Sequence, residues 1–332
     1  MKKWIKGMTA AGIASALLLA GCGEESKEKG QEASGKGEEK YQIGVTQIVE
    51  HPSLDNAYKG FKKALEDAGI EADYDVQIAQ GDQNNNQTIA NNFAGDKVDL
   101  IFANSTPSAT GALNATKDIP IVFTSVTDAK AAGLVKDPEK PGGNLTGTTD
   151  LHPEAIPKTI EFMAKEFEGK RVGVIYNAGE QNSVAQVDEV KKVMEKNGLK
   201  MVPVTVSASS EVKQATESLA GKADMIYIIT DNTVVSALES VVQVANQKDI
   251  PLFVGELDSV KRGGFAAFGF EYYDIGYEAG QMAVKILKDG EKPGDMAVQP
   301  PQNLKLLINE NAAKEMNIPI KDEWKKEAEF VK

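Results

Sequence analysis

Short β-rich runs alternate with amphipathic stretches from residue 41 onward, and this alternation constrains the fold more than any other feature. Residues 41–46 read YQIGVT and form the first β-rich run. The stretch 54–68 then carries Leu54, Tyr58, Phe61 and Leu65 at spacings of three and four, which is the helical period. Strands that alternate with helices predict βαβ units, and hence parallel sheets with helices on both faces.

The alternation falls into two series of similar size. The first series continues with predicted strands at 74–79, 98–103 and 119–123. The second begins after Pro153, where helices at 156–167, 184–196 and 233–247 accompany strands at 171–176, 201–206, 225–229 and 252–254. A helix at 275–288 and a strand at 304–308 follow. Since single cores stop growing at roughly 250–300 residues, a chain of 332 residues predicts two doubly wound parallel-sheet lobes of α/β class.

Two glycine-rich segments suggest where the chain passes between the lobes. Residues 142–147 read GGNLTG and divide the two series, and residues 263–269 read GGFAAFG. Glycine suits a hinge because it adopts backbone conformations that other residues avoid. We therefore predict crossing segments at both places.

Composition excludes several classes of function. The formal net charge of −12 argues against binding nucleic acid, which requires clustered Lys and Arg. One cysteine and two histidines, His51 and His152, exclude an internal disulfide, cysteine metal clusters and multi-histidine zinc sites. The sequence has no phosphate-binding P-loop and no G-x-S-x-G elbow. We predict no cofactor, no metal and no catalytic residue, with a carboxylate acid/base pair left open.

The amino terminus has the pattern of a secretory signal. Lys2, Lys3 and Lys6 precede an apolar stretch at 8–20 that is too short for a membrane span, and the chain continues through Gly21 to Cys22. The Leu-Ala-Gly-Cys sequence resembles the lipobox of bacterial lipoproteins, in which the cysteine is acylated and becomes the mature N-terminus. The resemblance implies a signal peptide at 1–21 and lipidation of Cys22, with a membrane lipid as partner.

Residues 23–40 read GEESKEKGQEASGKGEEK, with a single apolar residue. Such a segment buries too little surface to offset chain entropy. We expect residues 22–40 to form a flexible tether that holds a folded domain at the extracytoplasmic face of the cell membrane.

Candidate ligand-binding residues follow the predicted strands, because open parallel sheets bind ligands at the carboxyl ends of their strands. The loops at these ends carry hydroxyl, amide and carboxylate groups. The candidates are Glu50, His51, Asn104, Ser105, Thr106, Thr124, Ser125, Tyr176, Asn177, Asp231, Asn232 and Glu256.

This set of side chains suits a zwitterion. Ser and Thr hydroxyls near helix N-termini, such as Ser105 and Thr106, favour a ligand carboxylate. Asp231 or Glu256 would bind a ligand ammonium. The alternative for each residue is that it caps its own helix, and for His51 the structural and functional interpretations are evenly balanced.

Several segments in order resemble the tryptophan/tyrosine-binding type of ABC transporter substrate-binding proteins. They are GVTQIVEHPSLDNAYKGFKKALEDAG, LIFANSTPSATGAL, IPIVFTSVTDA, IYIITDNTV and LLINENAAKEMNI, and the resemblance extends over residues 41–319. It implies a type I periplasmic-binding-protein fold, in which two lobes are joined by a three-segment hinge. The N-lobe would comprise 41–146 and 270–305, and the C-lobe 147–269 and 306–332.

The same resemblance implies residue roles and partners. Ser105, Thr106, Ser125, Asp231 and Glu256 stand where amino-acid-binding relatives contact the α-carboxylate and the α-ammonium. The candidates for an aromatic cage are His51, Tyr58, Tyr176, Phe270 and Tyr272. The implied function is capture of a small amino-acid-like ligand, preferably aromatic, and delivery to an ABC permease. Open alternatives are a sugar or nucleoside ligand, a sensor, and a surface-anchored hydrolase.

Overall fold

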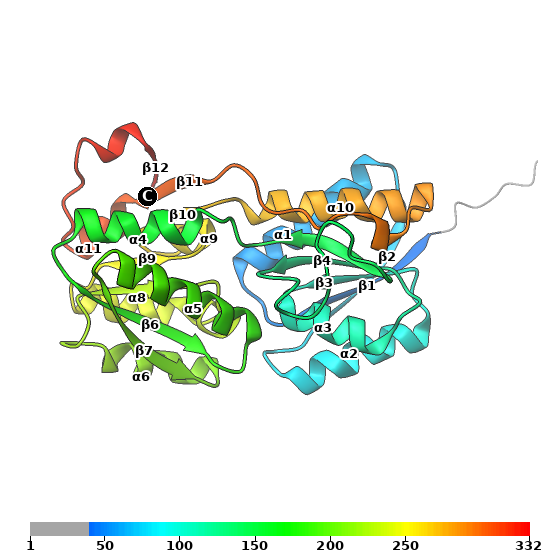
Figure 1. The fold of residues 1–332 in the computed structure, drawn as a ribbon, viewed down its shortest axis with the longest axis horizontal. Helices are drawn as coiled ribbons and strands as arrows, with labels where there is room; N and C mark the ends of the chain where they lie inside the picture. The colour runs from blue at the N-terminus through cyan, green and yellow to red at the C-terminus, as the bar shows by residue number, and fades with distance from the viewer. Residues whose placement is uncertain (1–39) are drawn as a thin grey trace, which may run out of the picture. The chain divides into compact units, whose positions relative to one another are not determined.

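The computed structural model describes residues 40–332, which belong to one compact unit. The predicted signal peptide at 1–21, Cys22 and the tether up to residue 39 lie outside the described residues. Within 40–332, no helix has both the length and the apolar character that crossing a membrane requires. The described unit contains two sheets with helices packed around each (Figure 1).

The first sheet has five parallel strands in the order β2-β1-β3-β4-β5. One face buries Phe102 under α1 and α10, and the other buries Ile101 under α2 and α3. This is the side-chain alternation expected of a strand covered on both faces. The elements are β1 (Tyr41–Gln47), α1 (Pro52–Asp67), β2 (Ala72–Ile78), α2 (Gln83–Asp96), β3 (Leu100–Asn104), α3 (Thr106–Ala115), β4 (Ile121–Val126), β5 (Leu145–Thr149) and α10 (Tyr272–Asp289).

The second sheet has seven strands in the order β12-β11-β10-β9-β8-β6-β7. Its strands are β6 (Arg171–Asn177), β7 (Lys200–Val206), β8 (Met225–Ile228), β9 (Leu252–Val254), β10 (Ala266–Gly269), β11 (Lys305–Asn309) and β12 (Ala328–Val331). Its helices are α4 (Ala155–Glu166), α5 (Gln181–Lys196), α6 (Val212–Ser218), α7 (Asn232–Val235), α8 (Leu238–Gln247), α9 (Leu257–Lys261) and α11 (Glu310–Glu315). Short 3₁₀ turns occur at Ser209–Glu211, Pro293–Asp295 and Trp324–Lys326.

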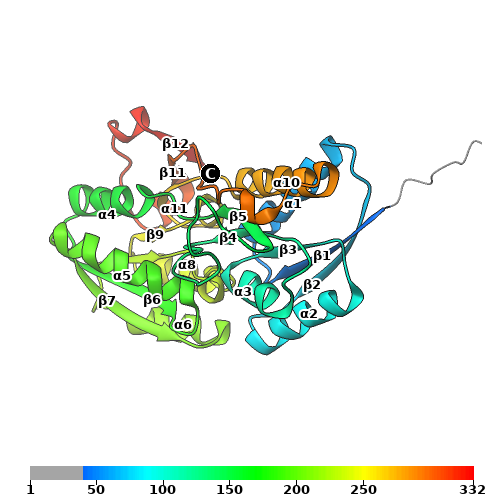
Figure 2. The ribbon, with the colours of Figure 1, turned by 45° about the vertical axis from the view of Figure 1, so that its right-hand side comes forward.

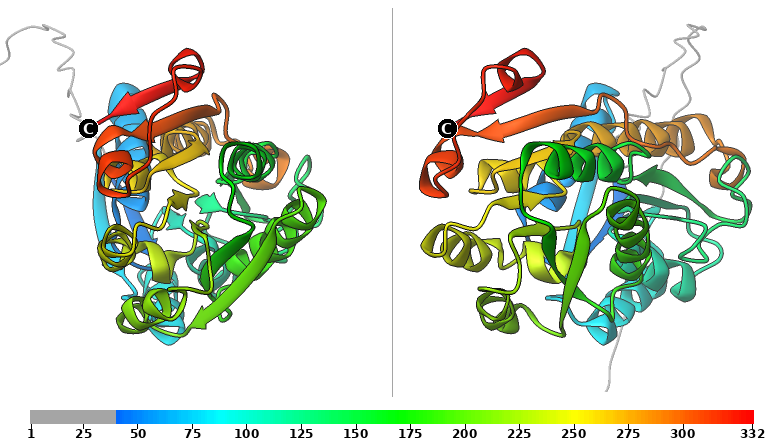
Figure 3. Two further views of the ribbon diagram at one scale, coloured as in Figure 1. Left: turned by 90° about the vertical axis from the view of Figure 1, so that its left-hand side faces the viewer. Right: turned by 60° about the vertical axis from the view of Figure 1, so that its left-hand side comes forward.

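The pairing of β10 with β11 is antiparallel, whereas the other strand pairs of this sheet are parallel. The antiparallel pair arises because the chain leaves the second sheet after β10, forms α10 on the first, and then returns to pair beside β10. Figure 3 shows β11 and β12, in orange to red, at one edge of this sheet. The predicted parallel-sheet lobes are thus confirmed, with one antiparallel pair that the sequence pattern did not indicate.

Three segments connect the two sheets, at 150–154, 270–271 and 300–304. The predicted boundary at 146 falls inside β5, which pairs along its length with β4. Gly147 permits this pairing, since a Cβ there would lie 2.0 Å from the carbonyl oxygen of Phe123. The segment 142–147 is therefore a loop followed by a strand, and the first crossing follows Thr149.

Two further predictions from the sequence are corrected in detail. Segment 263–269 contains β10, so the second crossing begins only after Gly269. The helix predicted at 233–247 is two helices, α7 and α8, which are separated at Ser236 and Ala237. The backbone leaves the helical region at Ala237.

Helix α10 lies along α1 in the first lobe, although 204 residues lie between them in the sequence (Figure 2). Gly276 allows this approach, because a Cβ there would lie 1.9 Å from the carbonyl oxygen of Ala57. Gly60 does the same on α1, facing the backbone of Tyr273. This is the return to the first lobe that the family resemblance implies.

Candidate functional site

The predicted site residues lie at the carboxyl ends of β1, β3 and β4 in the first lobe and of β6, β8 and β9 in the second. Nine of the twelve are buried, whereas Tyr176 and Asn177 are half-buried and Glu50 is exposed. Polar side chains at strand ends are ordinarily solvent-exposed, so this degree of burial requires that another part of the protein cover them. In this structure the two lobes cover each other.

Asn104 ties together the strand ends of the first lobe. Its amide donates to Gln47 Oε1 at 2.9 Å and to the Leu54 carbonyl at 2.8 Å, and its oxygen accepts from Ser125 Oγ at 2.8 Å. These bonds join the ends of β1, β3 and β4 to the start of α1. The side chain of Asn104 thus shapes the loops of the first lobe.

Two serines at these strand ends have unusual backbone angles. Ser105 has φ of 130° and caps α3 by accepting from the Ser108 amide at 3.2 Å. Ser125 has φ of 55°, in an irregular part of β4. Non-glycine residues at such angles cost on the order of 1–3 kcal/mol each and concentrate at functional sites.

The two threonines of the prediction differ in their surroundings. Thr124 Oγ1 lies 2.8 Å from Thr148 Oγ1, which donates to the Ile275 carbonyl, so Thr124 contacts the hinge side of the lobe. Thr106 Oγ1 is buried without a hydrogen-bond partner, and so is Asn182 Oδ1 at the start of α5. Both residues line one small gap between α3 and α5. Buried polar atoms are nearly always hydrogen-bonded, so these two require explanation.

The carboxylate of Asp231 is engaged by its own lobe. It accepts from the backbone amides of Asn177 at 2.7 Å and Val234 at 2.8 Å, and from Ser183 Oγ at 2.6 Å. Burial raises its pKa, and the charge of Glu180 adds to the effect. Asp231 is thus the N-cap of α7.

Glu180 lies beside Asp231 and is a residue that the sequence prediction missed. It is buried and accepts from Asn232 Nδ2, the Thr233 amide at 3.0 Å and Thr233 Oγ1 at 2.7 Å. It therefore fixes the orientation of Asn232, the neighbouring predicted site residue.

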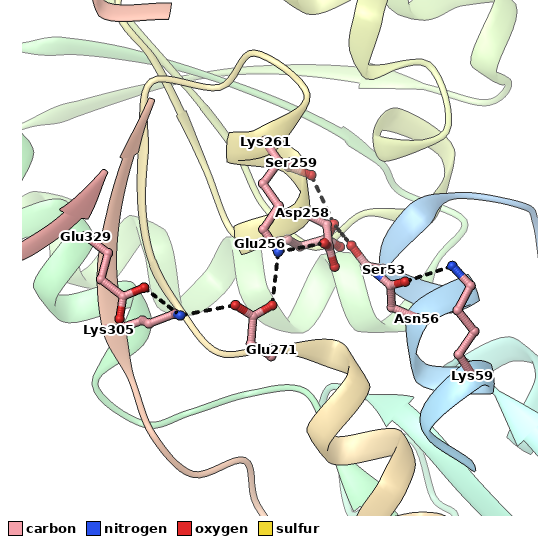
Figure 4. A network of polar contacts seen from close by, with 10 residues as sticks. All are labelled: Ser53, Asn56, Lys59, Glu256, Asp258, Ser259, Lys261, Glu271, Lys305 and Glu329. Atoms are coloured by element: carbon pink, nitrogen blue, oxygen red, sulfur yellow. Dashed lines mark hydrogen bonds and ion pairs between the residues drawn. The ribbon is translucent and has the colours of Figure 1, made fainter. Parts of the chain in front are cut away.

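Glu256 forms a direct bond between the lobes. Its Oε2 accepts from Ser53 Oγ of α1 at 2.6 Å and from Ser259 Oγ at 3.0 Å (Figure 4). Burial raises the pKa of Glu256 to about 7. Among the described residues, Glu256 forms no salt bridge with a lysine or arginine.

Asp150 is a second buried carboxylate at the lobe junction, in the first crossing segment. It accepts from the Tyr272 hydroxyl at 2.8 Å and from Thr127 Oγ1 at 3.0 Å. Burial raises its pKa to about 6, and the charge of Glu256 acts in the same direction. Asp150 likewise forms no salt bridge within 40–332. Two desolvated carboxylates near each other without a cation favour binding of a cation.

His51 occupies the N-cap position of α1, before Pro52. Burial lowers its pKa to about 4, and the Arg262 charge acts in the same direction. A hydrogen bond with Asn232 and the charges of Asp55 and Glu180 raise the pKa in opposition. The imidazole is therefore neutral at physiological pH. Its Nδ1 is buried without a hydrogen-bond partner.

The aromatic candidates occupy different places. Tyr58 packs against Tyr74 and Phe102 within the first lobe, with ring centroids 6.1 and 6.2 Å away, which places it in the core rather than at the strand ends. Phe270 stacks on Tyr272 at 5.5 Å in the second crossing, next to Asp150. Tyr176 is half-buried at the end of β6.

A chain of ion pairs lies beside Glu256 at the hinge (Figure 4). Lys261 contacts Asp258 at 3.2 Å and Glu271 at 3.1 Å, and Lys305 contacts Glu271 at 3.1 Å and Glu329 at 2.8 Å. The chain joins α9 to the second crossing and to the strands β11 and β12. Partly exposed ion pairs such as these each contribute little to stability, so we expect them to have little effect on the free energy of lobe closure.

Of two cavities within the described residues, the smaller lies at the lobe junction and the larger lies away from the predicted site. A cavity of about 120 Å³ lies at the lobe junction. Its lining includes Ile48, Val49, Gln80, Glu180, Asn232 and Thr233. A groove of about 1010 Å³ lies elsewhere, beside α1 and α10, and contains none of the predicted site residues. No group of three metal-ligating side chains occurs within 40–332.

Four residues at the junction were missed from the sequence: Ser53, Asp150, Glu180 and Gln186. The strand-end rule would have found Asp150 had β5 been recognised as a strand. Ser53, Glu180 and Gln186 lie on or before helices, and only the folded chain brings them to the opposite lobe.

Comparisons with known proteins agree on one family. A family described as ABC transporter substrate binding protein matches residues 42–332. A "Tyrosine-binding protein" of Clostridioides difficile is 44% identical over 95% of this chain and 93% of its own length.

Two solved structures add the fold. An ABC domain in complex with L-Trp from Streptococcus pneumonia is 33% identical, with a TM-score of 0.83 over 89% of this chain and 100% of that one. A ligand-free, open structure of a substrate-binding protein with adhesive properties from Clostridium difficile is 44% identical, with a TM-score of 0.65 over 88% of this chain and 99% of that one.

Members of this family are in general binding proteins rather than enzymes, and ABC substrate-binding proteins act outside the cytoplasm. The fold, two α/β lobes joined by three segments with strand-end loops facing each other, is that of type I periplasmic binding proteins. The chain belongs to the ABC transporter substrate-binding protein family.

Proposed function

We propose that this protein is the solute receptor of an ABC importer, which captures an aromatic amino acid between its lobes and delivers it to a permease by hinge closure. The observation that carries the proposal is the pair of buried carboxylates at the lobe junction, Asp150 and Glu256, neither of which forms a salt bridge within 40–332. The tyrosine-binding relative and the tryptophan-bound structure support an aromatic amino acid.

The ligand ammonium is assigned to Glu256, whose Oε1 accepts no hydrogen bond from residues 40–332, because both donors contact Oε2. Both oxygens of Asp150 already accept hydrogen bonds, so Asp150 adds negative charge beside the site without binding the ligand directly. The raised pKa values of the two carboxylates reflect the cost of holding them away from water, and a cation bound at Glu256 would offset that cost. Asp231 is a weaker candidate than the sequence indicated, because both of its oxygens already accept from amides or a hydroxyl of its own lobe.

The ligand carboxylate is assigned to the facing N-termini of α3 and α5. Helix N-termini carry free amides and a partial positive charge that favour an anion. Thr106 Oγ1, at the start of α3, is a buried hydroxyl without a partner and can donate to a carboxylate. Asn182 lies at the start of α5 and lines the same gap. Such a site suits a carboxylate that approaches from between the lobes.

A closed arrangement of the lobes is consistent with the two comparison structures. The tryptophan complex matches this structure with a TM-score of 0.83 at 33% identity, whereas the open, ligand-free structure reaches 0.65 at 44% identity. Sequence identity alone would predict the higher TM-score for the open structure, which is the more similar in sequence. The hydrogen bonds between the lobes support the same interpretation.

The proposed location is the extracytoplasmic face of the cell membrane. It rests on the signal peptide at 1–21, lipidation of Cys22 and the tether at 22–40, all of which remain predictions from the sequence. The exact lobe boundaries are also kept as a proposal, with the first crossing moved to follow Thr149.

A thermal-shift screen tests the proposed ligand class. The mature chain with Cys22→Ser is heated with amino acids, sugars and nucleosides, each at about 100 times the expected Kd. A ligand that binds only the folded state then stabilises it by about 2.7 kcal/mol, which raises the Tm by several degrees. We expect L-tyrosine or L-tryptophan to give this shift. A shift with sugars or nucleosides and none with aromatic amino acids would replace the proposed ligand with one of those classes.

A further inference from the structure

We propose that Gln186 and Thr127 are positioning residues that hold the two lobes closed around the ligand. The hydrogen bond between them joins the lobes, and it is part of a buried hydrogen-bond chain that extends to the first and second crossings. The inference rests on the proposed function and adds the device that sets how long a ligand stays bound. It requires no assumption about which amino acid is bound.

The chain runs through four side chains. Gln186 Nε2 of α5 donates to Thr127 Oγ1 at 3.2 Å, and Thr127 donates to Asp150 Oδ1 at 3.0 Å. The Tyr272 hydroxyl donates to Asp150 Oδ2 at 2.8 Å. Gln186 belongs to the second lobe, Thr127 follows β4 of the first, Asp150 lies in the first crossing, and Tyr272 begins α10 directly after the second.

Each of the four side chains is almost entirely buried, with 2–7% of its surface exposed. The donors and acceptors also match in direction, because the amide donates to the hydroxyl, the hydroxyl donates to one carboxylate oxygen, and the phenol donates to the other. A fully satisfied buried network of this kind is rigid and specific, whereas a partly satisfied one is costly.

The side chain of Gln186 is held in position by bonds within its own lobe, independently of its bond to the first lobe. Its Oε1 accepts from the Thr230 amide at 3.2 Å and its Nε2 also donates to Thr230 Oγ1. One hydrogen of the amide is thus fixed within the second lobe and the other is left for Thr127. Preorganisation reduces the side-chain entropy lost when the lobes meet.

Two other bonds join the lobes and provide comparisons. Ser53 donates to Glu256, a residue assigned to the ligand, so that bond cannot separate closure from binding. Gln181 Nε2 donates to the Ala131 carbonyl at 2.6 Å, but both residues are exposed. An exposed bond exchanges readily with water, whereas a buried donor or acceptor left without a partner costs more. We therefore expect Gln181 to contribute little.

The test uses Thr127→Val, which keeps the shape of the side chain and removes both of its hydrogen bonds. Thr127→Ser restores the hydroxyl, and Gln181→Ala is the matched control at an exposed interlobe bond. The rates kon and koff are measured by stopped-flow for whichever of L-tyrosine or L-tryptophan binds the mature Cys22→Ser chain. We expect Thr127→Val to raise koff about tenfold with kon within about threefold, and both controls to stay within about threefold of the parent.

An unchanged koff in Thr127→Val, or the same rise in Gln181→Ala, would overturn the inference. A loss of folding is recognised by the Tm of each variant, and Gln186→Glu then serves as the second variant, since it keeps the acceptor for Thr230 and removes the donor to Thr127.

A second measurement needs no ligand and separates this inference from the proposed function. Cys22→Ser leaves the chain without cysteine, so Ala131→Cys and Gln181→Cys can be joined by a short bis-maleimide at a rate that follows the closed population. Thr127→Val should lower that rate several-fold, and Thr127→Ser should restore it. If neither amino acid binds, the proposed function fails, but the cross-linking rate still tests the role of Thr127. An unchanged cross-linking rate in Thr127→Val would contradict that role.

Discussion

At the scale of single residues, the lobe junction combines side chains that cost stability with side chains that supply it. Glu256 and Asp150 are desolvated carboxylates. In contrast, Asn104 donates to two acceptors and Glu180 accepts from several donors. Ser105 and Ser125 add backbone strain. Sites that bind ligands commonly carry such costs, and mutations that relieve them stabilise the fold at the expense of function.

Glu256→Gln should increase the free energy of unfolding at pH 8 and weaken amino-acid binding. The shift of its pKa from 4.5 to about 7 corresponds to roughly 3 kcal/mol of cost when the group is ionised. Because the folded-state pKa is raised, this cost is fully present above about pH 7 and disappears as the pH falls toward 4.5. Urea unfolding at pH 5 and pH 8 measures the difference.

The parent protein should therefore lose stability between pH 5 and pH 8, and Glu256→Gln should lose less. Glu189→Gln, at an exposed position of α5, is the matched control and should follow the parent. Parallel pH profiles for the parent and Glu256→Gln would show that Glu256 is not the buried group responsible.

Asp231→Ala should mainly lower stability. The carboxylate caps α7 and also accepts from Asn177 and Ser183, so its removal leaves these donors unpaired and should cost about 1–3 kcal/mol. Calorimetric unfolding measures the loss, and titration of the folded fraction measures the affinity. Unchanged stability with abolished binding would return Asp231 to the direct ligand role that the sequence suggested.

At the scale of elements, the alternating pattern predicted the order of most helices and strands, because amphipathic periods reflect burial directly. β5 was missed because LTGTT contains a glycine, and Gly147 is required there by the close approach to Phe123 rather than by a hinge. The division between α7 and α8, and the antiparallel pairing of β11, depend on tertiary packing that no local pattern records.

The contact between α1 and α10 holds the first lobe together, and Gly276→Ala tests it. The added Cβ would lie 1.9 Å from the Ala57 carbonyl oxygen, so the helices must separate, and we expect a loss of about 3 kcal/mol or more of unfolding free energy. Gly95→Ala in α2 is the matched control. A Cβ there meets nothing within 4 Å, so this change should be neutral or stabilising by up to about 1 kcal/mol. Equal effects of the two substitutions would mean that close helix packing is not the cause.

At the scale of the whole molecule, sequence and structure account for different parts of the function. The strand-end loops could be predicted from the βαβ pattern, because parallel strands place their carboxyl ends on one edge. The pairing of residues across the junction could not, since Ser53 and Glu256 are 203 positions apart. The lipid anchor, in contrast, is a prediction that rests on the sequence alone.

Membrane attachment should be lost in Cys22→Ser expressed with its own signal peptide. Acylation of this residue would hold the exported protein at the membrane, and no helix within 40–332 offers an alternative span. Fractionation followed by immunoblotting should place the parent in the membrane fraction and the variant outside it. Retention of the variant at the membrane after a salt wash would contradict the lipid anchor.

The central claim, a zwitterionic aromatic ligand bound between the lobes, is tested most directly by titration calorimetry of the mature Cys22→Ser chain with L-tyrosine and L-tryptophan. We predict one site for at least one of them, with a Kd of about 1 µM or lower, which is about −8 kcal/mol. The matching amine without a carboxylate, and the matching acid without an amine, should each bind at least about 100-fold more weakly. Equal affinity for an amino acid and its amine or acid, or no binding of either amino acid, would contradict the account.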